Sequence, residues 1–236
     1  LLGRLSRAVG EALTAFELMS AFSLELVARH FPDLPARQLE TSPWSVLLEL
    51  SGASSDAGLS DRLSQILDAA LRAGEIRDAV VARNASQGAR LWAVRNAIPD
   101  AQRREGPSIK HDIALPRARM AAFIGEMLPL LESRFPGARP CIFGHLGDGN
   151  LHFNLSLPQE GDAQAFLDQR DALERLVHDR VVAQGGSFSA EHGIGQLKRG
   201  EMARYKDAVT LDLMRTLKRA LDPNDVMNPG KVLPDP

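Results

Sequence analysis

The sequence predicts an α+β domain built on a largely antiparallel sheet. Strand-like and helix-like segments alternate along all 236 residues, and about seven strands are expected, with helices packed on the sheet they form. No repeat, low-complexity stretch or linker-like change in composition divides the chain. Hydrophobic residues make up 44% and charged residues 25%, the balance of an ordinary globular protein that can bury a sizeable core.

Composition excludes several classes of function. A net charge of -2 gives no electrostatic basis for binding nucleic acid or an anionic membrane, and no apolar run approaches the ~18–20 residues that span a bilayer. The single cysteine, Cys141, excludes an internal disulfide and indicates a reducing compartment, so we expect a cytoplasmic protein. Neither a signal peptide nor a glycine-rich nucleotide-binding loop is visible. Because the chain starts at Leu1 rather than Met, we expect it to be trimmed or a piece of a longer polypeptide.

Apolar patterns and helix stops define the elements of the first half. Strands are expected at residues 13–19, 45–50 and 76–82. Helices are expected at residues 22–30, at about 60–72 and from 86 onward. Pro32 cannot continue the first of these helices, and Gly74 is a natural stop for the second.

The second half follows the same logic. Residues 108–115 alternate, with Lys110 and Asp112 on one face and His111 on the other, and Pro116 closes this strand. The next helix carries an apolar stripe from Met120 to Leu131, with a kink expected near Pro129. The remaining elements expected are strands at about 140–145, 150–157 and 187–190, a helix at about 162–184, and two further helices up to residue 221.

The most informative stretch reads Gly-His-Leu-Gly-Asp-Gly-Asn-Leu-His. Alternation places His152 on the polar face of its strand together with Asn154, and His145 ends the strand before it. Gly147 and Gly149 allow positive φ angles, so the turn can fold His145 back beside His152. One alternative is a tight hairpin whose histidines merely bond to the backbone. Two histidines across such a turn favour a divalent-metal site with open positions.

A second polar motif, Glu-His-Gly-Ile-Gly, begins at Glu191. On a regular strand Glu191 and His192 would point in opposite directions, but Gly193 and Gly195 give the backbone freedom to turn there. Glu191 then supplies a third metal ligand and His192 a general base, because a histidine with an ordinary pKa near ~6.5 suits proton abstraction near neutral pH. The alternative is a capping Glu-His pair that opens the next helix.

Two cations are candidates for holding a substrate carboxylate. Arg95 lies on a predicted helix and Lys110 on the polar face of a strand, and together they could grip a carboxylate. A solvated pair of surface charges explains them equally well. His111 faces away from Lys110, so we exclude His111 from the site.

Taken together, these segments resemble the C-terminal domain of the FAD-linked oxidases. That family includes D-2-hydroxyglutarate dehydrogenase, D-lactate dehydrogenase and the flavin subunit of glycolate oxidase. Three motifs occur in family order: Gly-His-Leu-Gly-Asp-Gly-Asn-Leu-His at 144–152, Glu-His-Gly-Ile-Gly at 191–195 and Leu-Asp-Pro…Asn-Pro-Gly-Lys at 221–231. Leu-Trp-Ala-Val-Arg at 91–95 with Lys-His-Asp at 110–112 is most similar to the hydroxyglutarate branch.

The resemblance implies how the chain is organised and what each candidate does. Residues 1–236 would form a substrate- and metal-binding domain of a ferredoxin-like-related kind, with a helical tail at about 198–236, and an N-terminal domain outside this chain would hold most of the FAD. The roles implied are metal ligands for a zinc-like ion (His145, His152, Glu191), catalytic base (His192), substrate contacts (Arg95, Lys110, Asn154) and a contact to FAD (Asn228). Pro99 stands where the hydroxyglutarate enzymes tend to carry a substrate-contacting threonine, which leaves the substrate side chain open.

The function expected is therefore oxidation of a D-2-hydroxy acid to a 2-oxo acid, with hydride transfer to FAD. The expected partners are the small acid, the FAD-binding domain of the same polypeptide and a second copy in a homodimer. Alone, the chain should be colourless and inactive as a dehydrogenase. Two alternatives stay open: a non-catalytic module that binds metal or a small acid, and a stand-alone metal-dependent hydrolase.

Overall fold

The computed structural model describes residues 1–39, 42–52 and 56–235. Its centre is a six-stranded antiparallel sheet of order β2-β1-β5-β6-β3, in which β4 also pairs with β6. The strands are β1 (Leu13–Ser20), β2 (Trp44–Leu50), β3 (Ser108–Ile109), β4 (Asp112–Ala114), β5 (Arg139–His145) and β6 (Asn150–Ser156). The predicted α+β class and antiparallel sheet are confirmed, with six strands in place of about seven.

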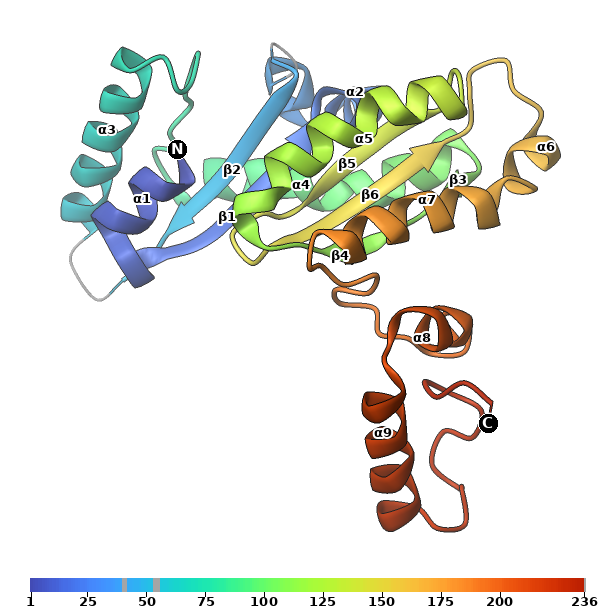
Figure 1. The fold of residues 1–236 in the computed structure, drawn as a ribbon. Helices are drawn as coiled ribbons and strands as arrows, with labels where there is room; N and C mark the ends of the chain where they lie inside the picture. The colour runs from blue at the N-terminus through green and yellow to red at the C-terminus, as the bar shows by residue number, and fades with distance from the viewer. Residues whose placement is uncertain (40–41, 53–55, 236) are drawn as a thin grey trace.

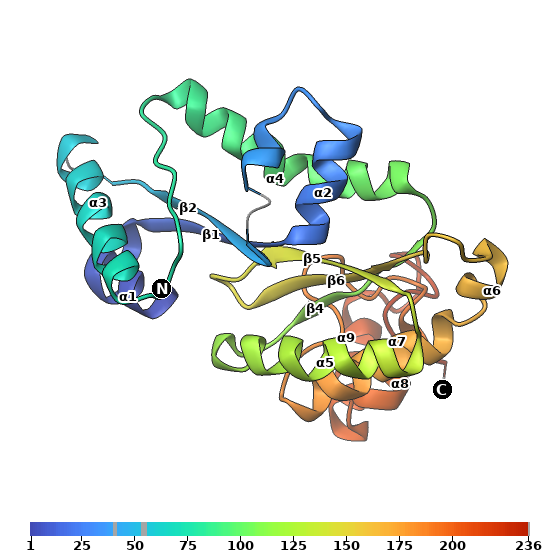
Figure 2. The ribbon, with the colours of Figure 1, turned by 90° about the horizontal axis from the view of Figure 1, so that it is seen from above.

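Helices cover both faces of this sheet. They are α1 (Leu2–Val9), α2 (Ala21–His30), α3 (Asp56–Arg72), α4 (Ala85–Glu105), α5 (Met120–Arg134), α6 (Ala163–Leu167), α7 (Arg170–Ala183), α8 (Arg199–Tyr205) and α9 (Ala208–Leu221). Figure 2 shows α2 and α4 on one face and α5 and α7 on the other. None of the helices in the described part of the chain is long and apolar enough to cross a membrane.

Strand alternation sends side chains from β5 and β6 into two separate cores. The core under α5 and α7 includes Ile142, Leu151 and Phe153, all nearly inaccessible to solvent. The core under α2 and α4 includes Cys141 and Phe143. On β6, Asn154 lies opposite Cys141 and His152 lies opposite Phe143. Because directly opposed residues point to the same face of a sheet, both of these polar side chains also lie on the α4 side.

Two appendages extend from the sheet. At one end, α1 and α3 pack on the projecting parts of β1 and β2, around the buried side chains of Leu5, Phe16 and Ile66. Below α7 and β4 in Figure 1, α8, α9 and the tail project away from the sheet. A hydrogen bond of 3.0 Å between His178 Nδ1 and Glu201 Oε2 links α7 to α8.

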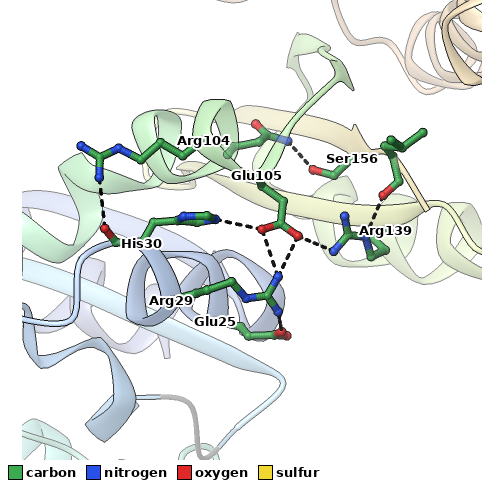
Figure 3. A network of polar contacts seen from close by, with 9 residues as sticks. Glu25, Arg29, His30, Arg104, Glu105, Arg139 and Ser156 are labelled. Atoms are coloured by element: carbon green, nitrogen blue, oxygen red, sulfur yellow. Dashed lines mark hydrogen bonds and ion pairs between the residues drawn. The ribbon is translucent and has the colours of Figure 1, made fainter. Parts of the chain in front are cut away.

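A carboxylate at the end of α4 fastens the α2 layer to the sheet (Figure 3). Glu105 accepts hydrogen bonds from Arg29 and His30 of α2, at 2.8 and 2.9 Å, and from Arg139 of β5 at 2.6 Å. Burial raises the pKa of Glu105, but the bonds from His30, Arg139 and Arg29 outweigh it and lower the pKa from 4.5 to about 2. This carboxylate is therefore charged over the whole working pH range.

Two expectations about strands are wrong. Residues 76–82 form no strand: none of the described strands pairs with them, and Val80 and Val81 are exposed. The strand expected at 187–190 is reduced to a single bridge between Ala114 and Ser187.

Two further elements are interrupted where a single one was expected. The strand expected at 108–115 splits into β3 and β4, since the backbone N–H of His111 donates to the side chain of Asn154 at 3.1 Å rather than to a strand neighbour. The helix expected at 162–184 breaks between α6 and α7, where Gln169 N–H turns back to the carbonyl of Phe166. By contrast, α5 continues through Pro129 to Arg134.

Candidate metal and substrate site

Register places the candidate side chains on one face of the sheet. Glu17 of β1 lies directly opposite His145 of β5. His152 of β6 lies opposite Phe143 on one side and opposite Asp112 of β4 on the other. Directly opposed residues in an antiparallel sheet point to the same face, so all five side chains share the face covered by α4.

The turn between β5 and β6 depends on glycine at two positions. Gly149 has φ +83°, and a Cβ there would lie 2.5 Å from the carbonyl oxygen of Leu115. Gly144 has φ +151°, and a Cβ there would lie 2.8 Å from the carbonyl oxygen of Asn150. The expectation that Gly147 adopts a positive φ is wrong: the chain reverses with Gly144 and Gly149 in that role.

Two imidazoles and a carboxylate meet at this turn. One ligand atom from each of His145, His152 and Glu191 lies within 4.8 Å of the others. Nε2 of His145 is 3.3 Å from Oε1 of Glu191, and that oxygen also accepts a hydrogen bond of 3.1 Å from Asn150. The structure thus brings together the three side chains that the sequence nominated from segments about forty residues apart.

His192 lies beside this cluster. Its ring stacks on that of His152, with centroids 5.7 Å apart and planes 25° apart, and its side chain is 65% exposed. The backbone bends here as expected, with Gly193 at φ +70° and Gly195 at φ +56°. Glu191 and His192 can therefore both face the site although they are adjacent in sequence.

A buried carboxylate holds this bend in place. Oδ2 of Asp112 accepts the backbone N–H groups of Ala190, Glu191 and His192 at 3.2, 2.9 and 2.8 Å. Burial raises the pKa of Asp112, but the N–H donors of His192 and Glu191 outweigh it and the pKa is lowered. Asp112 is 4% exposed and ionised, and it fixes the loop that carries Glu191 and His192.

A second buried carboxylate, Glu17, contacts His145. Its Oε1 accepts from Nδ1 of His145 at 2.7 Å and its Oε2 accepts from Nε of Arg95 at 2.8 Å. Sequence reasoning did not nominate Glu17 or give Asp112 a role. A signal for Glu17 was present, because it is a lone acid in the apolar run Leu-Thr-Ala-Phe-Glu-Leu-Met-Ser.

The two candidate cations have different surroundings. Arg95 is 6% exposed; beyond its bond to Glu17, its guanidinium lies 5.1 Å from the ring centroid of Phe143. Its terminal Nη atoms make no hydrogen bond to any residue in the described ranges. Lys110 is exposed and forms no ion pair within the same ranges.

The other predicted contacts lie outside this cluster. Asn154 is buried, and both ends of its amide are engaged: Oδ1 accepts from His111 N–H and Nδ2 donates to Gln102 at 2.9 Å. His111 points to the opposite side, where its ring lies 5.7 Å from that of His178, in agreement with its exclusion from the site. Asn228 is exposed in the tail, with φ +52°.

The donors present fit a borderline divalent cation such as zinc, which prefers imidazole nitrogen and carboxylate oxygen. Burial lowers the pKa of His152 even though the charges of Asp112 and Glu191 raise it, so the neutral, metal-binding form is favoured. A second group, Asp112 with His152 and His192, also lies within 4.8 Å. Oδ2 of Asp112 already accepts three N–H groups, so only its Oδ1 could serve as a ligand in this second group. A hollow of about 610 Å³ opens beside His145.

The model of the family described as FAD linked oxidases, C-terminal domain, matches residues 2–232. The chain belongs to this family. It is similar to a protein named D-2-hydroxyglutarate dehydrogenase, mitochondrial, from Rattus norvegicus, at 36% identity over 96% of this chain and 40% of the relative. A protein of that same name from Arabidopsis thaliana is 32% identical over 99% of this chain and 40% of the relative.

A bacterial relative named D-2-hydroxyglutarate dehydrogenase, from Xanthomonas citri pv. viticola, is 32% identical over 93% of this chain and 46% of the relative. The chain thus spans less than half the length of these curated relatives. Among solved structures, p-cresol methylhydroxylase with substrate bound is similar with a TM-score of 0.59 at 14% identity, over 98% of this chain and 49% of that one. The fold of this FAD-linked oxidase domain is therefore shared with a protein of very different sequence.

Proposed function

We propose that this domain binds the metal and the substrate of an FAD-dependent dehydrogenase that oxidises a D-2-hydroxy acid to a 2-oxo acid. One observation carries the proposal: His145, His152 and Glu191 converge within 4.8 Å, with His192 stacked beside them. The relatives named D-2-hydroxyglutarate dehydrogenase support the reaction class. Residues 1–236 form the C-terminal part of the enzyme in this proposal, with residues 198–236 as its helical tail.

The residues of the site divide into ligands and base. His145, His152 and Glu191 hold the cation, and zinc fits this donor set. When bound, such an ion supplies Lewis acidity that lowers the pKa of a coordinated hydroxyl, as zinc lowers that of water from ~15.7 to about 7. His192 takes the hydroxyl proton, because its ring lies beside the cluster and is exposed enough to exchange that proton with solvent.

In this proposal Arg95 and Lys110 bind the carboxylate groups of the substrate. Nε of Arg95 is engaged by Glu17, which fixes the guanidinium and leaves its terminal amino groups to hold a carboxylate. Lys110 adds a flexible point charge. Both ends of the Asn154 amide are hydrogen-bonded, so this side chain holds the neighbouring backbone at His111 and has no free group for the substrate. Pro99 lies one turn of α4 beyond Arg95 and has no hydroxyl to offer a substrate side chain, so the proposal covers glutarate-like, lactate-like and glycolate substrates alike.

The cofactor and partners complete the proposal. FAD, when bound, accepts the hydride from C2 of the substrate. A preceding domain of the same polypeptide would hold most of it, and Asn228 of the tail would contribute a contact to it. We further propose a cytoplasmic protein and a homodimer; the rat and Arabidopsis relatives are named mitochondrial.

The decisive experiment replaces His192 by Ala in the full-length, flavin-loaded protein. Loss of a positioned general base should lower kcat about 10²- to 10⁴-fold while the zinc content stays at the wild-type level. The measurements are elemental analysis and flavin bleaching with D-2-hydroxyglutarate, D-malate, D-lactate and glycolate. Near-normal turnover would reject the base assignment.

The same preparations distinguish the dehydrogenase from the two alternative functions, a hydrolase and a non-catalytic binding module. A hydrolase would turn over an ester or amide in a metal-dependent reaction of this chain alone. A non-catalytic module would bind metal or acid and bleach no flavin with any of the four substrates. Either result would replace the dehydrogenase proposal.

A further inference from the structure

We infer that Glu17 and Asp112 are positioning residues, one for each metal-binding histidine. The inference rests on the proposed metal site and adds the groups that set its geometry. Both carboxylates are buried, at 2% and 4% exposure, and each lies directly opposite its histidine in the sheet register. Neither residue was given a role on the basis of the sequence motifs.

Glu17 fixes the tautomer of His145. A carboxylate without a proton only accepts hydrogen bonds, so Nδ1 of His145, at 2.7 Å from Oε1, must be the donor. In the neutral ring Nε2 then carries no proton and is the available ligand atom. That atom is the one that faces Glu191, at 3.3 Å. The pairing thus directs a lone pair at the shared cation position.

Asp112 performs two tasks at His152 and the adjacent loop. Its Oδ2 is saturated by the three N–H groups of the 190–192 bend. Its Oδ1 is buried without a hydrogen-bond partner among the described residues, and the nearest ring nitrogen is Nδ1 of His152 at 3.8 Å. A small rotation of the His152 ring would bring Nδ1 within hydrogen-bond distance of this oxygen, and Nε2 would again be left for the metal. One carboxylate therefore sets both the ring of His152 and the backbone that carries Glu191 and His192.

The contrast with ordinary structural carboxylates supports this role. Glu105, on the same side of the sheet, is partly buried and also contacts a histidine, but two arginines share it. Glu17 is shared between Arg95 and His145, whereas Asp112 has no arginine or lysine partner in the described ranges. At the site, therefore, one oxygen of Glu17 accepts from an imidazole and one oxygen of Asp112 accepts from the site loop.

The test uses Asp112→Asn and Glu17→Gln, which keep shape and remove the charge. In Asp112→Asn the amide oxygen must serve the three N–H groups, so its NH₂ group faces Nδ1 of His152 and moves the ring proton to Nε2. In Glu17→Gln the amide faces two donors, His145 and Arg95, and can accept from only one of them. Zinc affinity, measured by chelator competition, should fall about 10- to 100-fold in each variant.

Two readouts distinguish positioning from general damage. Glu105→Gln, which destabilises the same face away from the site, should leave zinc affinity unchanged. Histidine ¹⁵N spectra of the metal-free chain should show Nδ1-protonated His145 and His152 in the wild type and a shifted tautomer balance in the two variants. This readout needs no metal, so it tests the inference independently of zinc binding. Failure of the wild type to bind zinc would reject the proposed metal site and leave the tautomer test in force. Wild-type zinc affinity and tautomers in both variants would overturn the inference.

Discussion

The face of the sheet beneath α4 has carboxylates at both ends, and their hydrogen-bond partners differ. At the end of α4, Glu105 is shared by Arg29, Arg139 and His30. At the β5–β6 turn, Glu17 and Asp112 face histidines and backbone N–H groups. Guanidinium groups are permanently charged donors and hold a carboxylate as a structural tie. An imidazole that donates through one nitrogen still has a second nitrogen to offer to a ligand.

Between Glu105 and the β5–β6 turn, three polar side chains form a hydrogen-bonded chain. Gln102 of α4 donates to Ser156 at 3.1 Å and accepts from Asn154 at 2.9 Å. All three side chains are buried and bonded, so this middle segment contributes a fixed support and leaves no group for a ligand. The two ends therefore differ in which donors surround each carboxylate, and Glu105 is partly buried whereas Glu17 and Asp112 are buried.

The largest expected effect would break the structural end. Replacing Glu105 by Gln leaves Arg29 and Arg139 without their shared carboxylate, and we expect the free energy of unfolding to fall by about 2–4 kcal/mol. Urea unfolding measures it. The matched control is Glu25→Gln: Glu25 also pairs with Arg29 but is exposed, so it should cost less than about 0.5 kcal/mol. Equal losses in the two variants would contradict the assigned role of Glu105.

A somewhat smaller effect is expected at the site end from Gly149→Ala. The new Cβ meets the carbonyl oxygen of Leu115 at 2.5 Å in a left-handed conformation, and a stability loss of about 2 kcal/mol together with weaker zinc binding should follow. Gly185→Ala is the control. It has φ +76° with no atom within 4 Å of the added Cβ, so it reports the backbone strain alone, about 1 kcal/mol, with zinc binding intact. A stability loss in Gly149→Ala no larger than that in Gly185→Ala would contradict the steric requirement for glycine at position 149.

Counted per pH unit, the smallest effect is the response of stability to acid. The folded pKa of Glu105, about 2, lies below its ordinary value of 4.5, so its contribution to stability is complete above pH 4.5 and is lost as the pH falls toward 2. The slope from this group is at most about 1.4 kcal/mol per pH unit. Unfolding curves of the wild type and Glu105→Gln between pH 2 and 5 should therefore converge as the pH falls. Parallel curves would show that Arg29, His30 and Arg139 do not hold this carboxyl ionised.

Local patterns in the sequence were sufficient for the class of fold, most elements and the nomination of His145, His152, Glu191 and His192. Alternation, glycine turns and proline stops act over a few residues, and they can be read without knowing what lies across the sheet. The same local patterns were wrong for residues 76–82, because an apolar run becomes a strand only when a neighbouring strand pairs with it.

Tertiary structure alone decided which groups surround the histidines. Glu17 and His145 are 128 residues apart, and only the β1–β5 register makes them a pair. Likewise, Asp112 reaches the 190–192 bend through β4, and Arg95 is tied to a carboxylate on a distant strand. Strand order and register arise from the packing of the whole chain, so the partners that orient a ligand are set by contacts that no short stretch of sequence contains.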